Sequence, residues 1–137
     1  VVALKGAATV VASPDGRCAV NPTGNPGMAK GGSGDVLAGM VGAFLAQGMQ
    51  AFEAAVLAVY LHGYAGDRCA ERLGQRAMLP TDLVEALPQV FQAFPAGKGP
   101  CEGATARKAA RPCEKVRAAS HGQGSLPQHL DVGDAVL

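Results

Sequence analysis

Asn21-Pro-Thr-Gly-Asn-Pro-Gly-Met-Ala-Lys-Gly-Gly-Ser-Gly34 is followed directly by Asp35-Val-Leu-Ala-Gly-Met-Val-Gly-Ala-Phe-Leu-Ala-Gln47, and this change of pattern decides the fold. Five glycines and two prolines in the first stretch exclude a regular helix or a central strand, so it is predicted to be a loop with tight turns. In the second stretch the apolar residues recur at helical spacing. We expect a helix there, with Ser33 or Asp35 as its N-cap and Gly48 at its end.

Short strands are predicted before this loop. The apolar run Val1–Lys5 is typical of a buried strand, and Thr9–Ala12 and Arg17–Val20 predict two more. Between them, Ser13-Pro-Asp-Gly16 has the residues that a tight turn prefers. The chain therefore opens as strand, turn, strand.

Helices are predicted after the loop. Residues 51–73 carry apolar residues at helical spacing, and a further helix begins at Thr81, which we expect to be its cap. That helix is expected to bend or restart near Pro88. Two or three strands before two or three helices indicate an α/β or α+β fold. The strands are too few for a complete sheet, so we expect a strand-rich region upstream.

Composition separates the end of the chain from the rest. All six aromatic residues lie within residues 1–94, and the 43 residues 95–137 hold none. We therefore expect one domain over 1–94 and a low-complexity tail over 95–137 that is disordered or foreign to the domain.

Charge and cysteine patterns exclude several classes of protein. Within residues 1–94, six basic residues balance seven acidic ones, which argues against a nucleic-acid or membrane-surface partner. No membrane span or signal sequence is predicted, so the expected location is cytoplasmic. The four cysteines have neither zinc-site nor disulfide-framework spacing, which indicates structural or incidental roles.

A strand, a glycine-rich loop and a helix N-terminus in succession can form an anion site, because backbone N–H groups and the helix dipole favour phosphate. Gly31-Gly-Ser-Gly34 fits this pattern but matches neither the Walker loop nor the dinucleotide fingerprint. A flexible helix cap is the alternative interpretation. Asp35 is likewise either a cap at the dipole or a general base on a substrate hydroxyl beside a transferred phosphoryl group.

Three segments carry a resemblance to a known family: Leu4-Lys-Gly-Ala-Ala-Thr9, Asn25-Pro-Gly-Met-Ala-Lys-Gly-Gly-Ser-Gly-Asp-Val-Leu-Ala-Gly39 and Tyr60-Leu-His-Gly-Tyr-Ala-Gly-Asp67. With them the chain, up to about Phe94, resembles the C-terminal part of the ADP- or ATP-dependent NAD(P)H-hydrate dehydratases of the ribokinase-like superfamily. The resemblance implies a partial ribokinase-like fold, namely the C-terminal part of a three-layer α/β/α domain. It also implies that the substrate-binding half of the domain is missing upstream.

The resemblance implies a hydro-lyase that repairs hydrated NADH and NADPH by phosphorylating the added hydroxyl with ADP or ATP, a reaction for which Mg²⁺ is expected. Asp35 would contact the hydrated substrate and act as the base, whereas no metal-ligand set is evident. The residues implied to bind the nucleotide are Lys5, Gly6, Ala7, Ala8, Thr9, Asn25, Gly27, Met28, Ala29, Gly31, Gly32, Ser33 and Gly34. The partners implied are small-molecule nucleotides and a fused or separate NAD(P)H-hydrate epimerase, and a homo-oligomer is compatible with the sequence.

Other functions and residues remain open at this stage. The alternatives to a dehydratase are a ribokinase-like small-molecule kinase and an inactive nucleotide-binding fragment. Lys30 is either a solvated loop residue or a phosphate contact, and His62 is predicted to be a packed, hydrogen-bonded histidine. Asp67 and Arg68 are predicted to lie on a solvated helix face.

Overall fold

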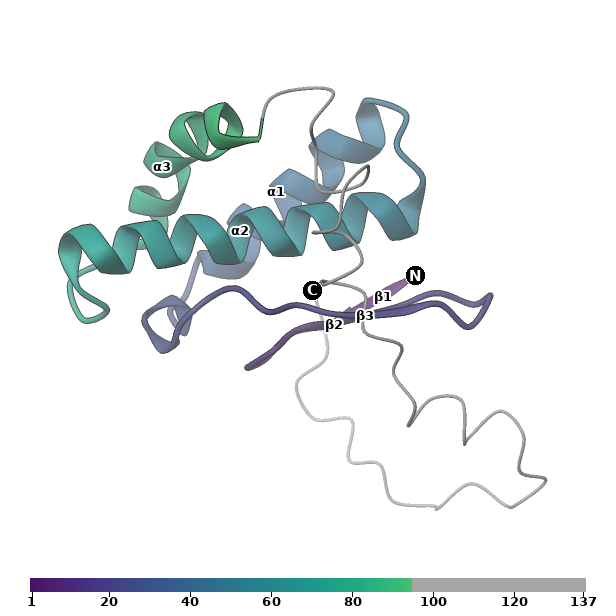
Figure 1. Ribbon diagram of the computed structural model, residues 1–137, viewed down its shortest axis with the longest axis horizontal. Helices are drawn as coiled ribbons and strands as arrows, with labels where there is room; N and C mark the ends of the chain where they lie inside the picture. The colour runs from purple at the N-terminus through teal and green to yellow at the C-terminus, as the bar shows by residue number, and fades with distance from the viewer. Residues whose placement is uncertain (95–137) are drawn as a thin grey trace, which may run out of the picture.

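The computed structural model describes residues 1–94 as three short strands followed by three helices (Figure 1). This arrangement confirms the expected α/β class. Residues 95–137, for which a tail is expected, lie outside the described residues. The elements in chain order are β1 (Val2–Leu4), β2 (Val10–Ala12), β3 (Cys18–Val20), the 3₁₀ turn η1 (Pro26–Met28), α1 (Ser33–Ala46), α2 (Ala51–Leu73) and α3 (Pro80–Ala93).

The three strands form an antiparallel sheet in the order β1-β2-β3. The predicted turn joins β2 to β3: the Gly16 N–H donates to the Ser13 carbonyl at 3.0 Å, and Gly16 has a φ of 86°. That φ lies in the left-handed region, which glycine adopts without steric cost. Register places Ala3, Val11 and Ala19 side by side, so these three residues share one face of the sheet.

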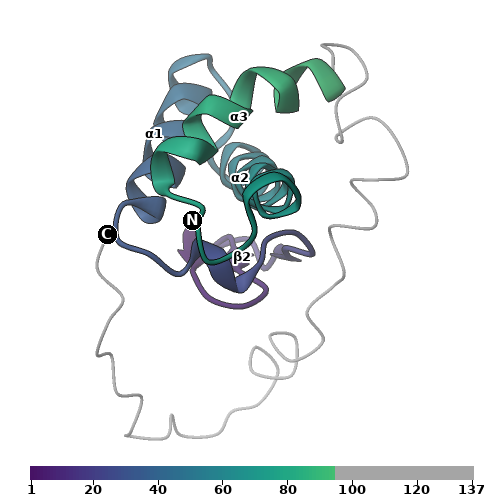
Figure 2. The ribbon, with the colours of Figure 1, turned by 90° about the vertical axis from the view of Figure 1, so that its left-hand side faces the viewer.

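All three helices lie on one side of the sheet, and α2 occupies the layer next to it (Figures 1 and 2). Viewed nearly along its axis in Figure 2, α2 lies between the strands and the pair α1 and α3. It contributes ten buried residues, more than either of the other helices. The core therefore surrounds α2, with Val11 below it and Leu83 and Val90 of α3 above. The second helical layer of a three-layer domain is not among the described residues.

The expectation of a buried first strand is wrong. Val2 and Leu4 are 65% and 60% exposed. β1 is one of the two edge strands, and the face of the sheet that carries these two side chains has no helix over it within residues 1–94 (Figures 1 and 2). Ala3, on the opposite face, is exposed as well, so β1 extends beyond the cover that the helices provide. An apolar run predicts burial only when a second layer is present to cover it.

Two predicted helix caps are also wrong, although the helices are where they are expected. Gly32, with a φ of 95°, is the N-cap of α1, and Ser33 is the first helical residue. Leu79 is the N-cap of α3, because Pro80 takes the first helical position that proline favours. Asp82, in the first turn, accepts a hydrogen bond from the Leu79 N–H at 2.6 Å, so this carboxylate fixes the N-cap residue, and no side chain caps the first helical N–H groups.

α3 does not restart at Pro88; it is one helix from Pro80 to Ala93. Its buried residues Leu83, Ala86 and Val90 hold it against α2 on both sides of the proline. Phe94, at its C-cap, packs edge-to-face on Tyr60 and Tyr64 of α2. Tertiary packing thus outweighs the hydrogen bond that proline removes.

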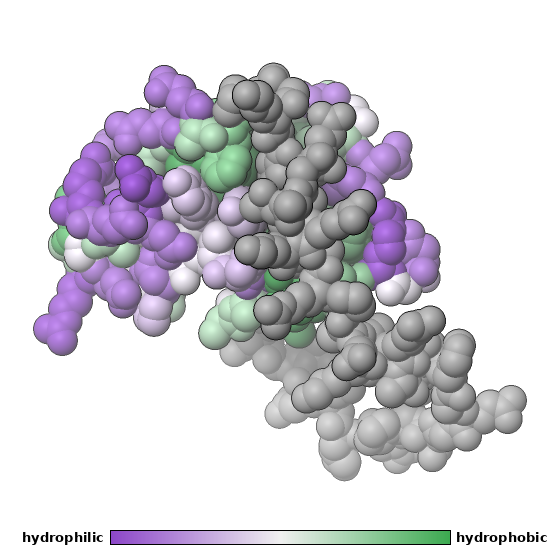
Figure 3. Space-filling model, in the orientation of Figure 1, coloured by the Kyte–Doolittle hydropathy of each residue, from purple (hydrophilic) through white to green (hydrophobic). Residues whose placement is uncertain are grey.

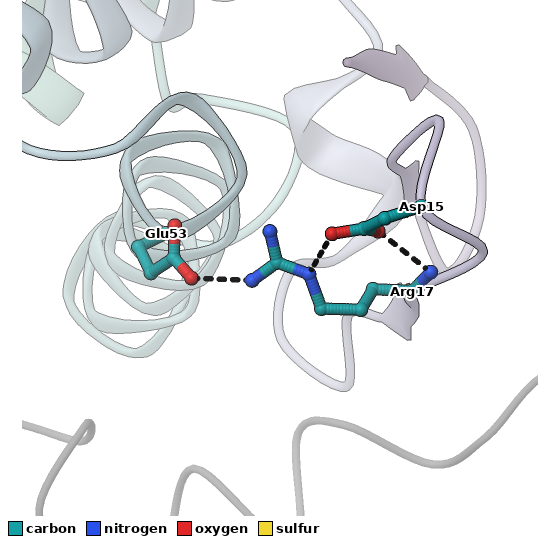
Figure 4. A network of polar contacts seen from close by, with 3 residues as sticks. All are labelled: Asp15, Arg17 and Glu53. Atoms are coloured by element: carbon teal, nitrogen blue, oxygen red, sulfur yellow. Dashed lines mark hydrogen bonds and ion pairs between the residues drawn. The ribbon is translucent and has the colours of Figure 1, made fainter.

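A polar network fastens the β2–β3 turn to the start of α2 (Figure 4). Arg17 pairs with Asp15 at 2.7 Å and with Glu53 at 2.5 Å, and its guanidinium lies 4.4 Å from the centroid of the Phe52 ring. The three charged side chains are between 40% and 51% exposed, so solvent screens these ion pairs and the network fixes orientation more than it adds stability.

Hydrophilic side chains gather at one end of the molecule, over the C-terminal end of α2 and its connection to α3 (Figure 3). The charged residues of this end that are exposed are Arg68, Glu71, Arg72 and Arg76. Arg68 pairs with Glu71 at 2.9 Å, which confirms a solvated position for Arg68. None of the helices within residues 1–94 is long and apolar enough to cross a membrane.

Candidate functional site

An open cavity of about 760 Å³ lies where the β1–β2 connection, the glycine-rich loop and the start of α1 meet the middle of α2. This volume is within the range of small-molecule and cofactor sites. A second gap, between the sheet and α2, measures only about 10 Å³ and holds no more than a water molecule. The larger cavity is therefore the candidate site.

Ten of the fourteen residues predicted for the site line this cavity. They come from segments that are far apart in the sequence: Lys5, Gly6, Ala7, Ala8, Thr9, Asn25, Met28, Ala29, Ser33 and Gly34. The cavity is also lined by Lys30, for which a phosphate contact was one of the two interpretations. The other lining residues were not among the predicted binding residues: Asn21, Gly24, Pro26, Leu37, Val59, His62 and Gly63. Those on α2 belong to the segment Tyr60–Asp67 or precede it directly. The resemblance of that segment to the family was therefore the sequence feature that could have indicated them.

Gly27, Gly31, Gly32 and Asp35 do not line the cavity. Gly27 is buried, and a Cβ there would lie 2.6 Å from the Gln75 carbonyl oxygen, so this glycine lets η1 approach the α2–α3 connection. Gly32 caps α1 in a left-handed conformation. These two glycines shape the loop behind the cavity wall rather than the wall itself.

The N-terminus of α1 leaves one backbone N–H group, that of Gly34, without a partner among the described residues. The Ser33 N–H donates to the Lys30 carbonyl at 3.3 Å, and the N–H groups of Asp35 and Val36 both donate to the Gly32 carbonyl. No acceptor among residues 1–94 takes the N–H of Gly34. Because Gly34 also lines the cavity, its N–H is the donor best placed for an anion at the positive end of the helix dipole.

Lys5 lies against this helix start. A Cβ at Gly34 would be 2.7 Å from the Lys5 Nζ, so the glycine leaves room for the ammonium group. Lys5 belongs to a connection in which Ala8 has a φ of 60°, the one positive φ among the described residues other than glycine. Such a conformation costs an alanine of order 1–2 kcal/mol, and strain of this kind often accompanies a binding loop.

Asp35 lies in the first turn of α1 and is exposed. It directly follows Gly34 but does not line the cavity, so its carboxylate is outside the volume that Lys5 and Gly34 enclose. Any group that meets both Gly34 and Asp35 must therefore extend from the cavity to the exposed side of α1.

His62 is buried on α2, and its Nε2 is 2.9 Å from the Ser33 carbonyl oxygen. A carbonyl only accepts, so the Nε2 carries the proton and donates. Burial lowers the pKa of His62, an effect opposed by the Ser33 hydrogen bond and reinforced by the Lys5 charge. The ring is therefore neutral near pH 7, and the prediction of a packed, hydrogen-bonded histidine is confirmed.

Lys30 is half-buried rather than fully solvated, and two of the three donors of its ammonium group are used within the fold. Its Nζ donates to the carbonyls of Arg76 and Met78, at 2.9 and 2.5 Å. These two carbonyls belong to the α2–α3 connection, so Lys30 fastens the glycine-rich loop to that connection. The ammonium groups of Lys5 and Lys30 thus have different roles.

The prediction of a solvated Asp67 is also wrong. Asp67 is half-buried, and its carboxylate accepts from the Gly24 N–H at 2.9 Å and from the Asn25 Nδ2 at 3.0 Å. The glycine-rich loop covers the face of α2 on which Asp67 lies. Thr23 of the same loop donates its hydroxyl to the Tyr60 carbonyl at 2.9 Å.

The described residues contain no group of three His, Cys, Asp or Glu side chains that would hold a metal ion. This part of the chain therefore offers no complete protein site for Mg²⁺. Cys69, whose thiol donates to the Asp82 carbonyl at 3.2 Å, is buried, and burial raises its pKa. It has the structural role predicted for it.

Comparisons with known proteins give concordant results. The chain is 54% identical over 92 residues to a bifunctional NAD(P)H-hydrate repair enzyme of Moorella thermoacetica, covering 67% of this chain and 17% of that protein. It is 42% identical over 94 residues to the ADP-dependent (S)-NAD(P)H-hydrate dehydratase of Bacillus subtilis, covering 69% and 34%. The chain thus spans about a third or less of the length of these relatives.

The fold is also shared with a solved structure. The ADP/ATP-dependent NAD(P)H-hydrate dehydratase of B. subtilis, co-crystallised with ATP and Mg²⁺, superposes with a TM-score of 0.65 at 41% identity, covering 68% of this chain and 34% of that one. Residues 1–89 match the family described as NAD(P)H-hydrate dehydratase. This match includes the three strands, α1, α2 and most of α3, and with them every residue that lines the cavity. The chain therefore belongs to the NAD(P)H-hydrate dehydratase family.

Proposed function

We propose that this chain is the nucleotide-holding portion of an ADP-dependent (S)-NAD(P)H-hydrate dehydratase, with ATP as the alternative nucleotide. The observation that carries the proposal is the convergence of Lys5–Thr9, Asn25–Ala29 and the α1 N-terminus on one cavity of about 760 Å³. Family membership over residues 1–89 supplies the reaction class.

The chemistry follows from the leaving group. Hydroxide leaves carbon poorly, so the enzyme transfers the terminal phosphoryl group of the nucleotide to the hydroxyl oxygen of the hydrated nicotinamide ring. An O–P bond forms as the bond to the nucleotide breaks. Phosphate then leaves with the C–O electron pair, and loss of a proton from the neighbouring carbon restores the double bond. The products are the repaired NAD(P)H, phosphate and the shortened nucleotide.

In this proposal, Lys5 and the Gly34 N–H bind the nucleotide phosphates. Both groups are on the cavity side of α1, and both favour negative charge. The Gly6–Thr9 backbone and the Asn25–Ala29 wall enclose the rest of the nucleotide. Gly27 and Gly32 shape the loop, and the Ser33 N–H, which already donates to the Lys30 carbonyl, contributes little to the anion site.

Asp35 is proposed as the base that takes the proton of the substrate hydroxyl. Its exposed position next to Gly34 suits a substrate that approaches from outside the cavity and meets the nucleotide at the start of α1. Because the described residues lack a complete set of protein ligands for Mg²⁺, no step is assigned to this ion.

A second repair activity is proposed as a partner. The M. thermoacetica relative is bifunctional, which supports an NAD(P)H-hydrate epimerase, fused or separate, as the companion of this enzyme. A cytoplasmic location and homo-oligomer formation remain predictions.

The test uses purified protein that carries this chain, with hydrated NADPH and either ADP or ATP. We expect the reduced-nicotinamide absorption band to return, together with free phosphate. Asp35→Asn is expected to abolish turnover and keep nucleotide binding, whereas Glu85→Gln, an exposed carboxylate on α3, changes neither. A stable phosphoester product would indicate a small-molecule kinase instead. Folded protein that restores no absorbance with either nucleotide contradicts the proposal, and joint loss of binding and turnover in Asp35→Asn would make Asp35 a helix cap.

A further inference from the structure

Asp67 is a carboxylate placed behind the wall of the candidate nucleotide cavity. It lies on α2, does not line the cavity, and is half-buried. Both of its oxygens are used: Oδ2 accepts from the Gly24 N–H at 2.9 Å and Oδ1 from the Asn25 Nδ2 at 3.0 Å. Gly24 and Asn25 themselves line the cavity.

Asn25 links the Asp67 carboxylate to the next part of the loop. Its Oδ1 accepts from the Gly27 N–H at 3.0 Å, and its backbone carbonyl accepts from the Met28 N–H at 3.1 Å. The Asn25 amide is thereby fixed in orientation, since its NH₂ group faces the carboxylate and its oxygen faces Gly27. The one-turn helix η1, which supplies Pro26 and Met28 to the cavity wall, depends on this side chain for its N-cap.

A carboxylate suits this position for a chemical reason. Gly24 and Asn25 both present N–H donors, and only a side chain with two acceptor oxygens and no donor satisfies both. An amide at position 67 would leave an NH₂ group facing one of these donors. The φ of 103° at Gly24 turns the backbone so that its N–H meets the helix.

We propose that Asp67 is a positioning residue for the nucleotide, acting through Asn25 to hold the 24–29 wall in its binding conformation. This inference rests on the proposed function and extends it to a residue that touches no ligand. The alternative is that Asp67 only stabilises the fold, in which case nucleotide affinity would not follow the hydrogen bonds.

Exchanging the amide of Asn25 and the carboxylate of Asp67 distinguishes a positioning role of Asp67 from a purely structural one. In the double variant Asn25→Asp with Asp67→Asn, the new amide at 67 accepts from Gly24 and donates to the new carboxylate at 25, which in turn accepts from Gly27. All three hydrogen bonds are kept. Asp67→Asn alone sets two amides against each other, and Asn25→Asp alone brings two carboxylates within about 3 Å, a repulsive contact. Glu71→Gln, one turn further along α2 and paired only with Arg68 among the described residues, is the control for loss of one negative charge.

The measurements are ADP titration by calorimetry, amide exchange at Gly24 and Gly27 by NMR, and thermal unfolding. We expect each single variant to weaken ADP binding about tenfold or more, the loss of roughly one charge-assisted hydrogen bond. Exchange at Gly24 and Gly27 should accelerate in step. The double variant is expected to recover affinity to within about threefold of the original and to recover the protection of both amides, and Glu71→Gln should change neither.

The outcomes distinguish this inference from the proposed function. Single variants that bind ADP as well as the original chain, or a double variant that regains amide protection without regaining affinity, overturn the positioning role. Variants that lose stability in proportion to the loss of affinity, with no recovery in the double variant, also overturn it. If the original chain binds neither ADP nor ATP while Gly24 remains protected, the proposed nucleotide site is wrong and Asp67 is a purely structural clamp.

Discussion

Gly63→Ala tests how closely the glycine-rich loop must approach α2. Gly63 is buried at the middle of α2, where the chain around Thr23 crosses it. A Cβ at position 63 would lie 2.7 Å from the Thr23 carbonyl carbon and 2.8 Å from its oxygen, and closer still to the Thr23 hydroxyl. Real Cβ atoms essentially never make such contacts with backbone, so either the loop or the helix must shift.

The expected change in the free energy of unfolding of Gly63→Ala is the sum of opposing effects. Alanine in a helix interior is favoured over glycine by about 1 kcal/mol. Overpacking against backbone costs about 1–3 kcal/mol. Displacing Thr23 also breaks its 2.9 Å hydrogen bond to the Tyr60 carbonyl, which contributes about 1 kcal/mol. We therefore expect the free energy of unfolding to fall by about 1–3 kcal/mol.

Two other glycines provide matched comparisons. At Gly42, on the exposed side of α1, an added Cβ would meet nothing within 4 Å, so Gly42→Ala should gain about 0.5–1 kcal/mol from helix propensity alone. At Gly66 the nearest atoms belong to the flexible side chain of Met28, which is able to move. Gly66→Ala is expected to lie between the other two variants.

Urea denaturation of the three variants and the original chain measures these differences, with the slope of the transition compared to verify that the unfolding reaction is unchanged. The order of stability should be Gly42→Ala, the original chain, Gly66→Ala, then Gly63→Ala. If Gly63→Ala is as stable as Gly42→Ala, α2 and the loop are not in close contact, and the reasoning from the Thr23 approach is refuted.

Two further predictions concern His62 and Lys30. Because burial lowers the pKa of His62 in the folded chain, the His62 imidazole of the unfolded chain is protonated at a higher pH than that of the folded chain. The free energy of unfolding should therefore fall as pH drops below about 6.5, by at most about 1.4 kcal/mol per pH unit. His62→Gln should remove this component from denaturation curves measured between about pH 7 and 5, and an unchanged pH profile would contradict it. Lys30→Met should lower stability by about 1 kcal/mol, since its bonds to the Arg76 and Met78 carbonyls are partly exposed, and leave ADP affinity within about twofold. A tenfold loss of affinity at unchanged stability would instead indicate a phosphate contact.

Local patterns predicted the elements of this fold. The bounds of α2 agree with the predicted 51–73, and the Ser13–Gly16 turn is present, because helical periodicity and turn residues act over a few positions. The N-cap of α3 was missed for a local reason: Pro80 at the first helical position displaces Thr81 into the helix. The exposure of β1 was missed because an apolar run indicates that a strand is suited to burial, but it does not show whether another layer of the fold packs on that strand.

The candidate site was only partly predictable. The segments that line the cavity carry recognisable motifs, so ten of the fourteen proposed residues converge as expected. The hydrogen bonds that hold these segments in place were not predicted. Asp67 and Asn25 are 42 residues apart in the sequence, and Lys30 and Met78 are 48 residues apart. No periodicity relates residues so far apart. From the sequence alone, a charged helical residue that another segment covers cannot be told apart from one that is exposed to solvent.

The spacing within Tyr60–Asp67 explains why a helix, rather than the loop itself, specifies the conformation of the cavity. The Tyr60 carbonyl, the His62 ring and the Asp67 carboxylate each accept from or donate to the loop, at Thr23, Ser33 and Gly24. Short polar bonds of this kind require the loop backbone to lie close to α2, and Gly63 and Gly66 are the residues that permit it. The loop is rich in glycine and has little conformational preference of its own. Its geometry is therefore imposed by α2, so substitutions at α2 residues that hold the loop but do not line the cavity, such as Asp67, are expected to alter the cavity without touching anything bound in it.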